Sequence, residues 1–155
     1  MEELYLESPR LLVRPFTEED APALHAVLSD PAVMRWIEPP FTPAQTAAFL
    51  REAGLCRPPR VYAVVRKDGG GLIGHLIWHP WDETAMELGW ILRRDCWGQG
   101  LARELTEAVL ARSEGDVVIE CCPEQAATRR LAERFGFRLT GERDGLVVYR
   151  LKRTY

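Results

Sequence analysis

The segment Asp95-Cys96-Trp97-Gly98-Gln99-Gly100-Leu101-Ala102 follows an apolar, strand-like run and leads into a helical pattern. It is therefore expected to form a strand-to-helix corner. Gly98 and Gly100 would let the backbone turn tightly and approach a ligand without an intervening Cβ. The first N–H groups of the new helix would point outward without a partner, and the helix dipole would add partial positive charge there. A phosphate or pyrophosphate is therefore the natural ligand. The alternative is a glycine-containing turn that binds nothing, because such short motifs often recur by chance.

The composition is that of an ordinary globular protein. The chain has 155 residues, of which 46% are hydrophobic and 28% are charged, which suffices for one domain with its own core. We expect a single domain over residues 1–155. The net charge of −3 gives no drive toward nucleic acid or an anionic membrane. No apolar run is long enough to cross a membrane and the N-terminal residues are acidic, so the sequence predicts a cytoplasmic location.

Cysteine and histidine residues give no sign of a metal site. The four cysteines show no C-x-x-C spacing, and we interpret them as reduced thiols: Cys56, Cys96, Cys121 and Cys122. His75 and His79 would share one face of a strand, but the sequence offers no third ligand at a fitting spacing. No metal is predicted, and the two histidines are expected to line a substrate pocket or to lie in solvent.

The residues before the glycine segment predict a strand, two helices and a three-stranded antiparallel meander. An acidic first turn after Thr17 and the capping box of residues 42–45 indicate the helix starts. Between the helices, residues 33–41 are apolar and irregular and are expected to form a lid or a packed loop. The expected strands are residues 10–14, 61–66, 72–78 and 85–92, and the expected helices are about residues 18–28 and 43–53.

The residues after the glycine segment predict a parallel strand pair, because a strand, a helix and another strand follow one another. The expected elements are a helix from residue 101, a strand at 117–121, a helix at 126–135 and strands at 138–143 and 146–151. Residues 69–74 match the dinucleotide-binding fingerprint, but a strand-like run follows them where that site requires a helix. We therefore reject a dinucleotide site.

Three motifs in this order resemble the GNAT family of acyl-CoA N-acyltransferases over essentially the full chain. They are Arg10-Leu-Leu-Val-Arg-Pro-Phe16, Glu87-Leu-Gly-Trp-Ile-Leu92 leading into Trp97-Gly-Gln-Gly-Leu-Ala-Arg-Glu104, and Thr128-Arg-Arg-Leu-Ala-Glu-Arg-Phe-Gly-Phe137. The branch that looks most similar is that of the ribosomal-protein alanine and serine N-acetyltransferases. The resemblance implies an α/β (α+β) fold with a mixed, mostly antiparallel central sheet of about six to seven strands and helices on both faces.

The resemblance also implies a site for acetyl-CoA as cosubstrate, without a metal. In the family the strand before the glycine loop splays from its neighbour, the pantetheine arm lies in the gap, and the loop amides hold the pyrophosphate. The residues implied here are Trp90, Ile91, Leu92, Trp97, Gly98, Gln99, Gly100, Leu101, Ala102, Gln125, Thr128 and Arg129. Asp95 departs from the family pattern, and Arg93 and Arg94 would either compensate its charge or remain solvated.

The catalytic assignment needs a carboxylate that takes a proton from the attacking amine and a hydrogen-bond donor for the departing thiolate. Glu120 and Glu87 lie in strand-like segments and are ranked nearly equal as general base. Many members have a tyrosine acid at the position occupied here by Ala132, so either Thr128, by donating a hydrogen bond to the thiolate, or water would take its place. The amide of Ile91 or Leu92 would polarise the acyl carbonyl.

The resulting function hypothesis is direct acetyl transfer to a primary amine, either a protein N-terminus or a small molecule. A catalytically weak acyl-CoA-binding module is the alternative, motivated by Asp95, Gln125 and the missing tyrosine at position 132. Neither nucleic acid nor a membrane is expected as a partner, and a homodimer is left open.

Overall fold

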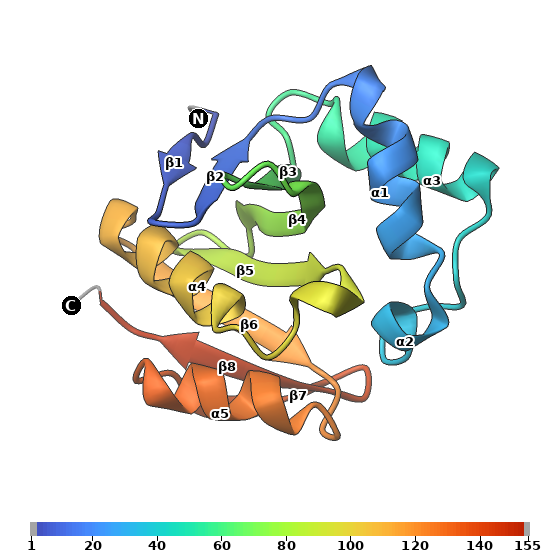
Figure 1. Cartoon of the computed structure of the whole chain (residues 1–155). Coiled ribbons are helices and arrows are strands. Elements are labelled where there is room, and N and C mark those ends of the chain that lie inside the picture. The colour runs from blue at the N-terminus through green and yellow to red at the C-terminus, as the bar shows by residue number, and fades with distance from the viewer. Residues whose placement is uncertain (1–2, 154–155) are drawn as a thin grey trace.

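The computed structural model describes residues 3–153, in which a single sheet carries helices on both faces (Figure 1). The sheet has eight strands in the order β1-β2-β3-β4-β5-β6-β8-β7. The strands are β1 (Leu6–Glu7), β2 (Leu11–Arg14), β3 (Val61–Arg66), β4 (Gly71–Pro80), β5 (Ala85–Leu92), β6 (Asp116–Cys121), β7 (Arg138–Arg143) and β8 (Leu146–Leu151). Neighbouring strands are antiparallel except for β5 and β6. The mixed, mostly antiparallel sheet and its single parallel pair are thus as predicted.

The eighth strand, β1, is absent from the sequence prediction. It has two residues and pairs with β2 at Leu6↔Val13 and Glu7↔Leu12. Two residues are too few to show the alternation by which a strand is recognised in a sequence. β1 therefore forms because β2 offers it an edge, and the count rises from six or seven strands to eight.

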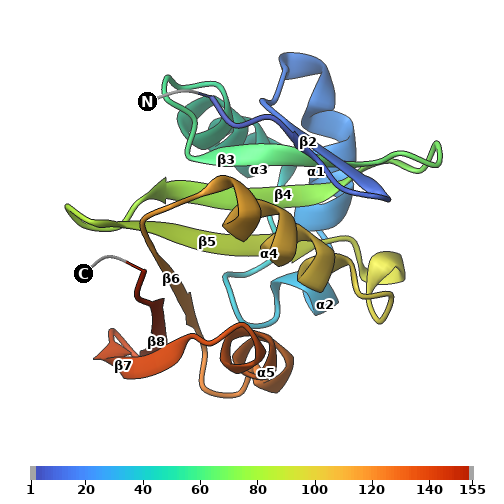
Figure 2. The same cartoon turned by 90° about the vertical axis from the view of Figure 1, so that its left-hand side faces the viewer.

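The helices divide between the two faces of the sheet. They are α1 (Ala21–Leu28), α2 (Pro31–Met34), α3 (Pro43–Phe49), α4 (Leu101–Arg112) and α5 (Ala126–Arg134). Figure 2 shows α4 in front of β4 and β5, with α1 and α3 behind the sheet. The predicted first helix begins as a 3-10 turn (Glu18–Asp20), and the second continues past α3 as a π-helical turn (Leu50–Gly54). No helix within residues 3–153 is long and apolar enough to cross a membrane.

Alternation along the strands produces two cores, one on each face. In β3, Tyr62 and Val64 pack toward α4, whereas Val61 and Ala63 pack toward α1. The first core also takes Leu101, Leu105 and Val109 of α4, and the second takes Leu24, Val27 and Leu28 of α1. Both faces of the central strands are buried, which is why their sequences are apolar almost throughout.

One local feature differs from the sequence expectation, and another agrees with it. Residues 31–34, at the start of the segment expected to be irregular, form α2, with Asp30 as N-cap accepting from the Ala32 amide at 2.9 Å. Gly74, part of the rejected fingerprint, lies in β4 opposite Leu92. A Cβ at this position would clash with the carbonyl oxygen of Ile91, so glycine is required there for close strand approach.

Candidate active site

β5 and β6 pair over less than half the length of β5. Their register is Ala85↔Asp116, Met86↔Val117 and Glu87↔Val118, and beyond Glu87 the pairing of β5 continues with β4 alone. Figure 2 shows β6 turning away from β5 along this stretch. A cleft of about 690 Å³ lies at the splayed end, walled by the last residues of β5, the glycine loop, the first turn of α5 and residues around α2.

The backbone at the end of β5 directs polar groups into this cleft. The Arg93 amide donates to the Ile73 carbonyl of β4 at 2.6 Å, whereas the Leu92 carbonyl accepts from Trp97 Nε1 at 2.9 Å. Successive residues of a strand present their N–H and C=O groups to opposite sides. The Leu92 amide is therefore on the side away from β4, facing the gap between β5 and β6.

The glycine loop has the conformation that its sequence requires. Gly98 and Gly100 have φ angles of 73° and 76°, in the left-handed region that favours glycine. A Cβ at Gly98 would meet no heavy atom within 4 Å, and at Gly100 it would meet only the Arg10 guanidinium at 3.7 Å. The space above both residues is open to a ligand, at the N-terminus of the twelve-residue helix α4.

The amides predicted to hold a pyrophosphate are not equivalent. The Trp97 amide already donates to the Arg94 carbonyl at 3.1 Å. The amides of the first turn of α4 have no intrahelical acceptor by the geometry of an α-helix. This leaves residues 98–102 as the candidates for the predicted pyrophosphate contact, while Trp97 contributes its half-exposed indole ring to the wall of the cleft.

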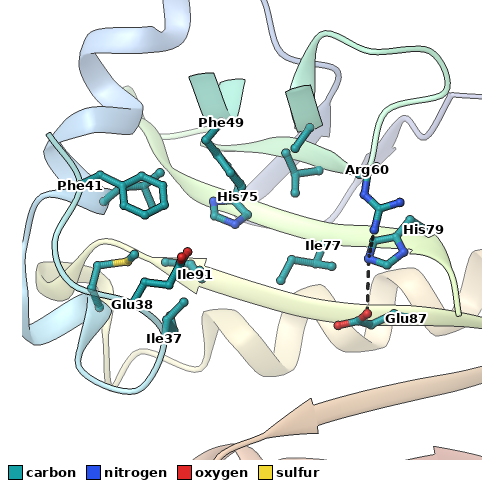
Figure 3. A pocket seen from close by; sticks show the side chains of 14 residues that line it. Ile37, Glu38, Phe41, Phe49, Arg60, His75, Ile77, His79, Glu87 and Ile91 are labelled. Atoms are coloured by element: carbon teal, nitrogen blue, oxygen red, sulfur yellow. Dashed lines mark hydrogen bonds and ion pairs between the residues drawn. The ribbon is translucent and has the colours of Figure 1, made fainter. Parts of the chain in front are cut away.

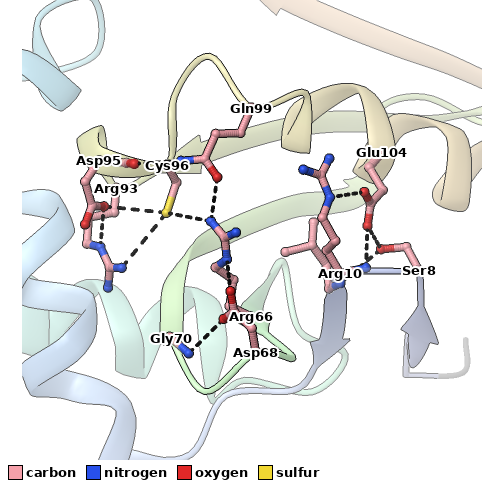
Figure 4. A network of polar contacts seen from close by, with 11 residues as sticks. Ser8, Arg10, Arg66, Asp68, Gly70, Arg93, Asp95, Cys96, Gln99 and Glu104 are labelled. Carbon is pink, nitrogen blue, oxygen red and sulfur yellow. Dashed lines mark hydrogen bonds and ion pairs between the residues drawn. The ribbon is translucent and has the colours of Figure 1, made fainter.

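A polar network fixes the loop from below (Figure 4). Gln99 donates to the Asp95 carbonyl at 2.9 Å and accepts from Arg66 at 2.8 Å. Arg93 Nε donates to the Asp95 carboxylate at 2.6 Å, and this contact lowers the pKa of Asp95. Arg93 thus compensates the acid as expected, whereas Arg94 pairs with Asp30 at 3.1 Å instead.

The first turn of α5 closes the opposite side of the cleft. Gln125 and Thr128 both line it, and Gln125 is held in place because its side-chain oxygen accepts from the Cys122 amide at 2.9 Å. Arg129 is outside the cleft lining: it donates to the Tyr149 hydroxyl at 2.9 Å and to the Pro123 carbonyl at 3.0 Å. Ala132 is fully buried in the core.

A second cavity of about 230 Å³ lies on the α1–α3 face of β4 and β5 (Figure 3). Its walls are mostly apolar, and its polar lining comes from Glu38, Arg60, His75, His79 and Glu87. Ile37 and Ile91 line both this cavity and the larger cleft. The two spaces therefore meet at the end of β5, beside the Leu92 amide.

Glu87 and His79 face each other across β4 and β5 in this second cavity. Glu87 Oε1 lies 3.3 Å from His79 Nε2, and both side chains are 14% exposed. His79 Nδ1 lies 2.9 Å from the Pro80 carbonyl, which accepts its proton, so Nε2 of the neutral ring is an acceptor. Arg60 Nη2 approaches the same nitrogen at 3.4 Å. In the neutral ring, Nε2 can therefore accept a hydrogen bond from Arg60 or from the protonated form of Glu87.

Burial favours the neutral forms of both groups, although the positive charges of Arg60 and Arg143 oppose its effect on the pKa of Glu87. Burial raises the pKa of Glu87 to about 7, and the negative charge of Glu120 adds to the rise. Burial lowers the pKa of His79, and the nearby Arg60 guanidinium lowers it further. Glu87 is thus poised to change its protonation near neutral pH, as a general base must.

Glu120 lies on the same side of the sheet as Glu87. It pairs with Val148 of β8, and burial raises its pKa as well, against the opposing effect of Arg143. Its charge acts on Glu87, so the structure brings both predicted bases together. The neighbouring Cys121 points into the core, and burial raises the pKa of its thiol to about 11.

Sequence reasoning missed the partners that give Glu87 its environment. Arg60 stands before β3, outside every motif, and Phe49 ends α3. Both reach the cavity from segments distant in sequence from β5. His79 was noted, but only the strand register, which places it opposite Glu87, assigns it a partner. Among residues 3–153 no three His, Cys, Asp or Glu side chains gather closely enough to hold a metal ion.

Comparison with known proteins gives a consistent family. A sequence model of the acetyltransferase (GNAT) domain matches residues 10–138. The uncharacterized N-acetyltransferase YnaD of Bacillus subtilis (strain 168) is 27% identical over 145 residues, which cover 89% of this chain and 85% of YnaD.

Solved structures share the fold at lower identity. An acetyltransferase of the GNAT family from Bacillus anthracis superposes with a TM-score of 0.84 at 23% identity, covering 97% of this chain and 99% of that one. RimL, a ribosomal L7/L12 α-N-protein acetyltransferase in complex with coenzyme A, gives 0.80 at 21% identity, with 96% and 98% covered. FdhC, a nucleotide-linked sugar GNAT, gives 0.77 at 16% identity, with 97% and 91% covered. The last two differ in the kind of molecule they are named for, so the shared fold leaves the acceptor undetermined.

Proposed function

The chain belongs to the GNAT acetyltransferase family and is an N-acetyltransferase, and we propose that it passes the acetyl group of acetyl-CoA directly to a primary amine within a ternary complex. The proposed acceptor is a protein N-terminus, as in the ribosomal-protein branch that the sequence resembles, or a small-molecule amine. GNAT enzymes use acetyl-CoA, which supplies the activated acyl group when bound.

The observation that carries the proposal is the junction of the two spaces at Ile91. The larger cleft has the open glycine loop and the splayed strand end that suit a phosphate-bearing, elongated cosubstrate. The smaller cavity is lined by two acids, the exposed Glu38 and the largely buried Glu87, that suit a basic acceptor. Because Ile37 and Ile91 line both, an acyl group from one side and an amine from the other would meet there.

On the cosubstrate side, residues 98–102 would hold the pyrophosphate and the gap-facing backbone of β5 from Trp90 to Leu92 would bind the pantetheine arm. The Leu92 amide would donate to the acyl oxygen as negative charge develops there. This refines the choice between Ile91 and Leu92, since the Leu92 carbonyl turns away from β4 to accept from Trp97.

On the acceptor side, ionised Glu87 would take the proton that the attacking nitrogen loses. Glu87 stands four residues before Ile91 in β5, a separation of about 13 Å along an extended strand. That is beyond direct reach of a carboxylate, so the proton would pass through ordered water. Glu120 would assist by keeping the pKa of Glu87 high.

The bonds then balance as one substitution. The new N–C bond forms and the C–S bond breaks. The nitrogen proton goes to Glu87 and returns through water to the thiolate, which accepts a hydrogen bond from the Thr128 hydroxyl as it leaves. Thr128 is supported in this role because it lines the cleft on the first turn of α5. Arg129 is less well supported as a cosubstrate contact, since its guanidinium is engaged with Tyr149 and Pro123.

The test is consumption of acetyl-CoA over a panel of small amines and of peptides with free N-termini. We expect turnover on at least one acceptor, and Glu87→Gln should lower kcat without changing the Kd for acetyl-CoA. Tight binding of acetyl-CoA with no turnover on any acceptor would contradict the proposal and support a binding module instead.

A further inference from the structure

His75 occupies an unusual position for a polar side chain. It lies in the middle of β4, opposite Ile91 of β5, and its side chain is 1% exposed. Its ring packs against Phe49 with centroids 5.2 Å apart and lines the smaller cavity beneath Phe49 and beside Phe41 (Figure 3). The flanking positions in the strand, Gly74 and Leu76, are apolar, so the strand itself gives no reason for a histidine.

The imidazole lacks a protein partner for one of its nitrogens. Within residues 3–153, His75 Nδ1 is the one buried side-chain nitrogen or oxygen without a hydrogen bond. The other buried polar side chains are paired: Asp20 with Arg14, Thr46 with His25, Thr106 with the Ala102 carbonyl and Asp116 with Arg150. A buried, unpartnered polar atom destabilises a fold and calls for an explanation. A stable core alone would favour leucine or phenylalanine here.

The ring is neutral, which limits what it can recognise. Burial lowers the pKa of His75 to about 4, so at neutral pH it carries one N–H donor and one acceptor nitrogen. Such a ring does not compensate the charge of a carboxylate or of an ammonium group. It can form a hydrogen bond with a hydroxyl or a neutral N–H. Because no protein group bonds Nδ1, a bound molecule would determine the tautomer and the orientation of the ring.

The walls define the shape and polarity of that occupant. Phe41 and Phe49 meet edge to face at 5.9 Å, and Leu28, Met34 and Ile77 complete an apolar lining. The volume of about 230 Å³ is below the roughly 300–1,000 Å³ of sites for drug-sized ligands. The acids of the cavity, Glu38 and Glu87, are suited to a basic group.

We propose that this cavity binds the non-reacting body of the acceptor, a compact apolar or aromatic group bearing one uncharged hydroxyl or N–H, and that His75 is the specificity residue that hydrogen-bonds that group. The inference rests on the proposed function, because it assigns the cavity to the acceptor. The same chemistry is offered by a small aromatic amine and by the first side chain of a peptide.

Two matched pairs of acceptors isolate the single hydrogen bond. The first pair is tyramine and phenethylamine, and the second is a short peptide beginning with tyrosine and the same peptide beginning with phenylalanine. We expect wild-type protein to prefer the hydroxylated member of the active pair by about tenfold or more in kcat/KM. Activity confined to one pair identifies whether the source is a small amine or a peptide.

Variants at His75 then test its part in that preference. His75→Phe should reduce the preference to about one or reverse it, and should raise the melting temperature, because it removes the unpartnered nitrogen. His75→Asn keeps a polar group near the Nδ1 position and should retain part of the preference. Phe49→Leu is the matched control: it reshapes the same cavity without a polar change and should affect both members of a pair alike.

The outcomes separate this inference from the proposed function. Failure of every amine and peptide to be acetylated, with acetyl-CoA still bound, contradicts the proposed function. Acetylation without a preference, or with a preference that survives in folded His75→Phe, overturns the role of His75 and leaves the transferase standing. Should His75→Phe fail to fold, a preference unchanged in His75→Asn overturns the inference equally.

Discussion

The cleft at the glycine loop and the cavity beneath Phe49 adjoin at Ile91, but backbone groups shape the cleft and side chains shape the cavity. The cleft depends on backbone: the φ angles of Gly98 and Gly100, the amides at the start of α4, and the unpaired end of β5. The cavity depends on side chains from α1, α2, α3 and three neighbouring segments of the sheet. A backbone site can be shared by many sequences of one fold, whereas a side-chain site belongs to one chain.

This difference explains why the comparisons identify a family but no acceptor. The fold persists at 21–23% identity, and a cosubstrate held by main-chain groups, as proposed, would constrain only a few glycines and a strand register. The lining of the acceptor cavity is free to vary around them. We therefore predict that substitutions in the cleft abolish the binding of CoA, while substitutions in the cavity alter kcat or the choice of acceptor.

The largest effect should follow from a substitution in the cleft, where the proposed contacts with CoA come from the backbone. Gly98→Trp would place a bulky side chain in the open space above the loop and force a left-handed φ on a residue that disfavours it. We expect the affinity for CoA, measured by calorimetry, to fall by about 100-fold or more.

A matched control separates strain from obstruction. Gly69 has a φ of 90°, and a Cβ there would also meet no heavy atom within 4 Å, but it lies in the β3–β4 turn outside the cleft lining. Gly69→Trp should lose comparable stability and keep its affinity for CoA. Equal loss of binding in both variants would mean that the glycine loop acts through stability and not as a binding site.

The next largest effect is expected on kcat, from substitutions of the acids at and near the smaller cavity. Glu87→Gln should lower kcat by about 100-fold, the usual contribution of a general base, while Glu120→Gln should lower it less, since Glu120 acts through the pKa of Glu87. Because a base works when ionised, wild-type kcat should rise with pH around a midpoint near 7. In Glu120→Gln the midpoint should move down, as a neighbouring negative charge is removed. An unchanged rate in both variants would leave water as the base.

Glu87→Gln should also stabilise the protein at high pH. The pKa of Glu87 in the folded state, about 7, exceeds its ordinary value of 4.5. Its stabilising contribution is present below pH 4.5 and is lost as pH rises through 7. Denaturant unfolding at pH 5 and pH 8 should therefore show that Glu87→Gln gains on the wild type as pH increases. A difference that is independent of pH would contradict the raised pKa.

The cleft and the cavity also differ in how far the sequence predicts them. β5 has the predicted bounds of residues 85–92, and the loop from Asp95 to Ala102 forms the expected corner, because alternation and glycine spacing are local signals. The Glu87–His79–Arg60 cluster depends on the register of β4 against β5 and on the position of a residue outside the strands. No local pattern encodes that register. The unpartnered nitrogen of His75 is likewise visible only once α3 is packed over the sheet.

The smallest effect is expected where the sequence departs from its family pattern. Asp95 stands beside the glycine loop, and an uncompensated acid there would repel phosphate. Its carboxylate, however, is 69% exposed and accepts from Arg93 at 2.6 Å. Exposed pairs of this kind contribute little, so Asp95→Asn should change the Kd for CoA by less than about threefold. Arg93→Gln, which leaves Asp95 uncompensated, should weaken CoA binding more than Asp95→Asn does, and the loss should shrink at high salt. Tighter binding by tenfold in Asp95→Asn would instead show that the acid opposes the anion and that Arg93 does not neutralise it.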